Sequence, residues 1–73
     1  MCNCDKKEKI EELSALVHHM KHHTEHHTEE IVKLAESAES LGFKDAEEAL
    51  KEAKILSDKL IEALAKACAA IEE

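Results

Sequence analysis

The residues best suited to chemistry are six histidines, which occur as three adjacent pairs within one short stretch of the chain. These residues are His18, His19, His22, His23, His26 and His27. A run of consecutive histidines would suggest a purification tag, whereas pairs separated by other residues at helical spacing indicate a pattern that belongs to the fold. Imidazole nitrogens are common ligands of transition metals. The stretch is therefore a candidate metal site.

On a helix the histidines form two ladders. His19, His23 and His27 form the inner ladder, which turns toward the expected core, and the outer ladder lies on the flank that faces solvent or another chain. The outer ladder is His18, His22 and His26. Successive members lie about 6 Å apart along the axis, a separation that two ligands of one ion can span. The ends of a ladder are about 12 Å apart, so complete coordination requires groups from another helix or chain.

Three cysteines add candidate ligands. Cys2 and Cys4 form a CxC pair in a short N-terminal tail, and Cys68 lies in an alanine-rich helix end, where a small buried apolar role is common. An odd number argues against a closed disulfide framework and leaves metal binding, redox chemistry or inter-chain pairing open. Imidazole and thiolate together suit zinc, nickel, cobalt, copper or iron, and the spacing does not choose among these metals.

Other interpretations of the histidines stay open. Those of the outer ladder can be solvated polar residues on a helix flank. Those of the inner ladder can form a polar layer with Thr24 and Ser57 that fixes the register of a helical bundle. A third possibility is a pH switch, in which protonated histidines repel one another.

Composition predicts an all-α protein made of long helices. The 73-residue chain has 37% charged residues, one Gly and no Pro, which is typical of helices rather than sheet or disorder. Asp5 and Glu8 resemble a capping box, so we expect a flexible tail over 1–4 and one domain over 5–73. The first helix is expected over about 6–41.

A turn is expected over 42–45, because Gly42 and Phe43 suit a Schellman-type helix end. Asp45 and Glu48 form a second capping box, which places the second helix at about 46–71. So short a connection predicts an antiparallel hairpin in which facing residue numbers add up to about 86.

Apolar residues recur every three or four positions on both helices. On the first helix we expect the stripe to be Ile10, Leu13, Val17, Met20, Ile31, Leu34, Ala38 and Leu41. A lone hairpin leaves half of each stripe exposed to water. We therefore expect a homodimer that forms a four-helix bundle.

Charge and hydropathy exclude several partners. With 17 acidic and 10 basic side chains the net charge is −7, so neither a nucleic acid nor an anionic membrane is expected as a partner. No stretch approaches the length of a membrane span, and the N-terminus lacks the apolar region of a signal peptide. A cytoplasmic location is expected.

From about Leu13 onward the chain resembles a small, uncharacterised family of helical-hairpin domains from archaea and anaerobic bacteria. That family carries a His-Trp-x-x-x-His-Asn-x-x-x-His pattern, an apolar stripe, a Leu-Gly turn and an alanine-rich second helix. The corresponding residues here are His19, Met20, His23, Thr24, His27, Leu41 and Gly42. Met20 and Thr24 replace the Trp and Asn of the pattern. The resemblance implies handling of a transition metal.

Together these features predict a non-enzymatic protein that binds a transition metal for storage, buffering or delivery. No general base in a pocket is evident, and so small a bundle has little room for a substrate cleft. The alternative is a structural or oligomerisation module whose histidines set register or sense pH.

Overall fold

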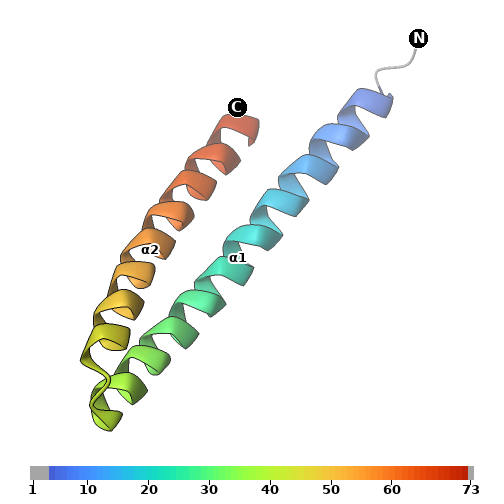
Figure 1. The fold of residues 1–73 in the computed structure, drawn as a ribbon. Coiled ribbons are helices and arrows are strands. Elements are labelled where there is room, and N and C mark those ends of the chain that lie inside the picture. The colour runs from blue at the N-terminus through green and yellow to red at the C-terminus, as the bar shows by residue number, and fades with distance from the viewer. Residues whose placement is uncertain (1–3, 73) are drawn as a thin grey trace.

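The computed structural model describes residues 4–72 of the chain, which form two antiparallel α-helices (Figure 1). Helix α1 spans Cys4–Leu41, and helix α2 spans Lys44–Glu72. The hairpin is elongated, with extents of 63 × 14 × 12 Å, and the N-terminal end of α1 projects beyond α2 (Figure 1). The expected all-α helical hairpin is confirmed. Helix α1 begins two residues earlier than the expected start near Lys6.

The helices meet along a central seam in which buried or half-buried residues recur every three or four positions. Its members are Ser14, Val17, Lys21, Thr24, Thr28, Ile31, Ala35 and Ala38 of α1, with Glu47, Leu50, Lys54, Ser57, Ile61, Leu64, Cys68 and Ile71 of α2. This repeat of three and four is the geometry of coiled-coil packing. The seam contains small and polar residues as well as aliphatic ones.

The central seam of α1 lies one residue later than much of the predicted stripe. Leu13 and Met20 are 51% and 56% exposed, whereas Ser14 and Lys21, the residues that follow them, are half-buried. The distance between packed helices depends on the side chains at the contact. The small residues of the seam let α2 approach closely, and the larger apolar residues remain on the flank.

The turn between the helices is a Schellman motif, as predicted. Gly42 has a φ of +82°, and its N–H donates to the Glu39 carbonyl over 3.1 Å. The Phe43 N–H donates to the Ala38 carbonyl over 2.9 Å. Glycine adopts this left-handed conformation at no steric cost.

Helix α2 begins earlier than predicted. The Glu47 N–H donates to the Phe43 carbonyl over 2.9 Å, so Phe43 ends the Schellman motif and also caps the next helix. The expected start at Ala46, capped by Asp45, is two residues late. Asp45 lies instead in the first turn of α2, where a carboxylate interacts favourably with the helix dipole.

A hydroxyl pair fixes the level at which the two helices face each other. Thr28 is buried and hydrogen-bonded to Ser57 across the seam, and its hydroxyl donates to the Thr24 carbonyl over 2.8 Å. The two paired residue numbers add up to 85, within one of the predicted sum. Residues 28 and 57 therefore lie at the same level along the hairpin.

Candidate metal centre

All six histidines are exposed on α1, and none belongs to the central seam. The expectation that the inner ladder faces the core of the hairpin is wrong for a single chain. Lys21, Thr24 and Thr28 occupy the seam at this level. The cause is the same shift of one residue that leaves Met20 exposed.

The hairpin separates the histidines onto different faces. His23 and His27 immediately precede seam residues, whereas His18 and His22 immediately follow them. At about 100° per residue these two groups lie on opposite sides of the seam. The remaining histidines, His19 and His26, are the ones turned farthest from α2.

The face that carries His23 and His27 is otherwise largely apolar. It consists of the residues that precede the seam residues, and we call it the apolar face. Its α1 members are Leu13, Leu16, Met20, His23, His27, Glu30, Leu34, Ser37 and Leu41, and its α2 members are Ala49, Ala53, Leu56, Leu60, Ala63, Ala67 and Ala70. Because the helices are antiparallel, both sets lie on the same side of the hairpin.

His23 and His27 are the two histidines whose rings come closest together. Their Nε2 atoms are 3.0 Å apart, and their ring centroids are separated by 4.4 Å. Neutral imidazoles at this distance share a hydrogen bond. Zinc–nitrogen bonds of about 2.0–2.1 Å place two tetrahedral ligands roughly 3.3 Å apart, so the same geometry suits a shared metal ion.

The third member of the inner ladder stands farther away. The ring centroids of His19 and His23 are 6.1 Å apart. Among the side chains of residues 6–72, no three His, Cys, Asp or Glu residues converge on a common point. One chain therefore supplies two converging nitrogens, and a complete site requires further ligands.

A carboxylate lies behind the histidine pair. His27 Nδ1 is 3.8 Å from Glu30 Oε2, an ion-pair contact longer than a hydrogen bond, and a carboxylate near the second ring nitrogen is a common partner of a metal-binding imidazole. Glu30 was not among the site residues predicted from the sequence. Its spacing of three residues from His27 is the signal that could have identified it.

The outer histidines contact carboxylates individually. His18 Nε2 is 2.8 Å from Glu72 Oε1, which joins α1 to the end of α2. His22 Nδ1 is 3.2 Å from Glu25 Oε1. Such contacts are typical of solvated polar residues on a charged face. Each joins one histidine to one carboxylate and brings no two histidines together.

The cysteines are not combined with the histidines. Cys68 is a free thiol that is only 6% exposed, and it packs within the central seam. Its burial is that of a small apolar residue. Cys2 and the side chain of Cys4 lie outside the part of the chain that the structure describes.

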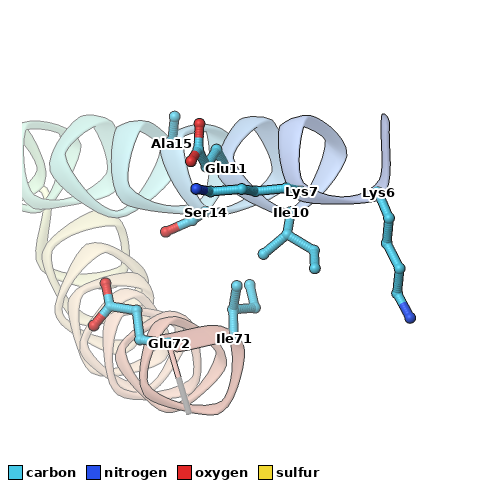
Figure 2. A pocket seen from close by; sticks show the side chains of 8 residues that line it. All are labelled: Lys6, Lys7, Ile10, Glu11, Ser14, Ala15, Ile71 and Glu72. Atoms are coloured by element: carbon cyan, nitrogen blue, oxygen red, sulfur yellow. The ribbon is translucent and has the colours of Figure 1, made fainter. Parts of the chain in front are cut away.

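An open groove lies where α1 extends past α2. It has a volume of about 670 Å³, and Figure 2 shows Ile10 and Ile71 pointing toward each other across it. Lys6, Lys7 and Glu72 lie around the two isoleucines. No histidine lines this groove, so it is separate from the candidate metal centre.

Fold and site together define a helical hairpin with a pair of exposed, converging histidines on an apolar face. The chain belongs to a family described as a domain of unknown function, DUF8180, which matches residues 13–71. The predicted resemblance to an uncharacterised family agrees with this match. No curated protein and no solved structure matches the chain. Neither described helix is long and apolar enough to cross a membrane.

Proposed function

We propose that this protein is a non-enzymatic transition-metal-binding protein that stores, buffers or delivers its ion. His23 and His27 are the principal ligands, and His19 extends their ladder. The observation that carries the proposal is the 3.0 Å separation of the His23 and His27 Nε2 atoms. Two imidazole nitrogens held at this spacing chelate an ion without a large rearrangement of α1.

The chemistry of the pair favours a particular group of metals. Neutral imidazole binds zinc, nickel, cobalt, copper and ferrous iron. The remaining candidate ligands are secondary in this proposal and bind an ion only weakly. They are His18, His22, His26, Cys2, Cys4 and Cys68.

A homodimer in a reducing compartment completes the proposal. The exposed apolar face supports self-association, because contiguous apolar surface of this kind marks interaction sites. The free thiol of Cys68 is compatible with the cytoplasm, where thiols remain reduced.

Competition titration with a chromophoric chelator tests the metal site. We expect His23→Ala and His27→Ala to weaken Zn²⁺ binding by more than about tenfold, since even groups behind a ligand have effects of that size. His22→Ala and His26→Ala are matched controls, with the same spacing on other parts of α1. Equal affinity in all four variants would refute the assignment.

The second candidate function is an oligomerisation module without metal. The extent of the exposed apolar residues favours it, since they alone can drive self-association. The Thr28–Ser57 pair already lies within the seam, so histidines are not needed for register inside one hairpin. In this case a chelator would leave association unchanged, whereas the metal proposal predicts that it weakens association.

A further inference from the structure

The apolar face has a symmetric arrangement of positions on each helix. On α1, its residues form pairs equally spaced about the level of Glu25: Leu13 and Ser37, Leu16 and Leu34, Met20 and Glu30, His23 and His27. On α2, Ala53 and Ala67 are equally spaced about Leu60, and the pairs Ala49 and Ala70, and Leu56 and Ala63, centre half a residue before it. Each helix therefore presents a face that can pack against an antiparallel copy of itself.

The two centres lie at the same height along the hairpin. Residue numbers 25 and 60 add up to 85, which is the sum for Thr28 and Ser57 across the central seam. A single two-fold axis can therefore cross both helices at this level. The same rotation then brings α1 of one chain against α1 of the other, and α2 against α2, so that the two apolar faces pack together.

From this register we propose that a second copy of the chain docks on the apolar face, with its turn at the opposite end. His23 and His27 of both copies then surround one tetrahedral metal ion on the two-fold axis. The inference rests on the proposed metal-binding function and specifies the partner and the ligand set. The proposed shared site also explains why His23 and His27 of one chain bring two nitrogens together without a third ligand beside them.

Helix spacing selects this orientation over the alternative with both turns at one end. With opposed turns, α1 packs directly on α1 of the second copy, at a distance of about 8–10 Å between axes. With turns together, the two copies of α1 lie on a diagonal of the bundle, roughly 12–14 Å apart. Four imidazoles share one ion more readily across the shorter distance.

The hairpin is comparable in size with one side of a standard dimer interface. The hairpin is 63 Å long and 14 Å wide, and a standard interface covers about 800 Å² on each partner. Alanines dominate the α2 part of the face, so the second helices can also approach closely. A site enclosed in this way excludes water from the ion.

The geometry favours particular metals among those that imidazole binds. Four nitrogen ligands in a tetrahedral arrangement suit Zn²⁺ and Co²⁺, whereas Cu²⁺ and Ni²⁺ prefer square-planar or tetragonal sites. Co²⁺ is therefore an informative probe, because tetrahedral Co²⁺ absorbs visible light far more strongly than octahedral Co²⁺.

The test is a Co²⁺ titration followed by visible absorption, together with the solution mass of the complex. For the intact chain we expect one Co²⁺ per two chains, a dimer mass and strong tetrahedral absorption. Leu60→Glu places two carboxylates together on the proposed axis, and we expect it to give monomers with more than about tenfold weaker Co²⁺ binding. Ile55→Glu is the matched control on the opposite face and should behave like the intact chain.

Leu60 and Ile55 are 48% and 55% exposed, so either substitution is compatible with a folded hairpin, which circular dichroism checks. Ala63→Glu gives a second disruption of the same face. Binding of one Co²⁺ per monomer, unchanged in Leu60→Glu, would overturn the shared site and leave the proposed function standing. If neither the intact chain nor any variant bound Co²⁺ or Zn²⁺, both the shared site and the proposed metal-binding function would be refuted.

Discussion

At the scale of single residues, spacing of four along a helix identified the histidines that can act in pairs. His23 and His27 approach to 3.0 Å because one helical turn places them on the same face. The same rule applies to His22 and His26, so spacing alone could not distinguish the pairs. What distinguishes them is the position of α2, which depends on contacts between residues far apart in the sequence.

Glu30 provides a test of how the pair is oriented. We expect Glu30→Gln to weaken Zn²⁺ binding by about tenfold, because it removes the negative charge of the carboxylate that lies 3.8 Å from His27 Nδ1. Glu29→Gln removes the same charge one residue away and should have little effect. Equal losses in the two variants would mean that only net charge matters. Competition titration measures both.

The Glu47–Lys51 ion pair gives a pH-dependent prediction. Lys51 Nζ lies 2.7 Å from Glu47 Oε2, and this hydrogen bond lowers the pKa of Glu47 below its ordinary value of 4.5. A lowered carboxyl pKa adds stability above the unfolded-state pKa, and that stability is lost as pH falls through the folded-state pKa. Glu47→Gln should therefore lower the melting temperature at pH 7.

The difference between the variant and the intact chain should disappear well below pH 4.5. Glu47 in turn raises the pKa of Lys51 above 10.5, so the contribution persists at moderately alkaline pH. Thermal melts followed by circular dichroism from pH 2 to pH 9 measure the difference. A difference that stays constant through the acid range would show that packing, not charge, is responsible.

At the scale of elements, local signals predicted the turn better than the packing of the helices. Gly42 was recognisable because few residues other than glycine adopt a positive φ at a helix end. The start of α2 was missed because Phe43 combines the end of one helix with the cap of the next. The central seam of α1 was predicted only in part. Two stripes displaced by one residue both repeat every three or four positions, and the sequence does not show which of them faces α2.

Gly42→Ala tests the contribution of the turn. A methyl group at Gly42 would meet no atom within 4 Å, so its cost is the strain of a φ of +82°. We expect the free energy of unfolding to decrease by about 1 kcal/mol. Ser37→Ala, on an exposed part of α1, should change it much less. Urea denaturation measures both variants, and a neutral Gly42→Ala would show that the turn tolerates another conformation.

At the scale of the whole molecule, the hairpin leaves much of its apolar surface unpaired. Among the residues whose side chains the structure describes, eleven large apolar ones are exposed, including Leu16, Leu34 and Leu56 on the apolar face. The sequence predicted that a lone hairpin would be insufficiently buried, but it could not indicate which flank would remain open. The tertiary register supplies that information and places the histidine pair on the open flank.

Element analysis of the protein isolated without added metal tests whether His23 and His27 hold a transition metal. The intact chain and two double variants, His23→Ala/His27→Ala and His22→Ala/His26→Ala, are purified in parallel without an affinity tag. We predict that the intact chain and the second variant retain a transition metal, at up to one ion per two chains. The first variant should lose most of it. An intact chain without transition metal, or equal retention by both variants, would contradict the account.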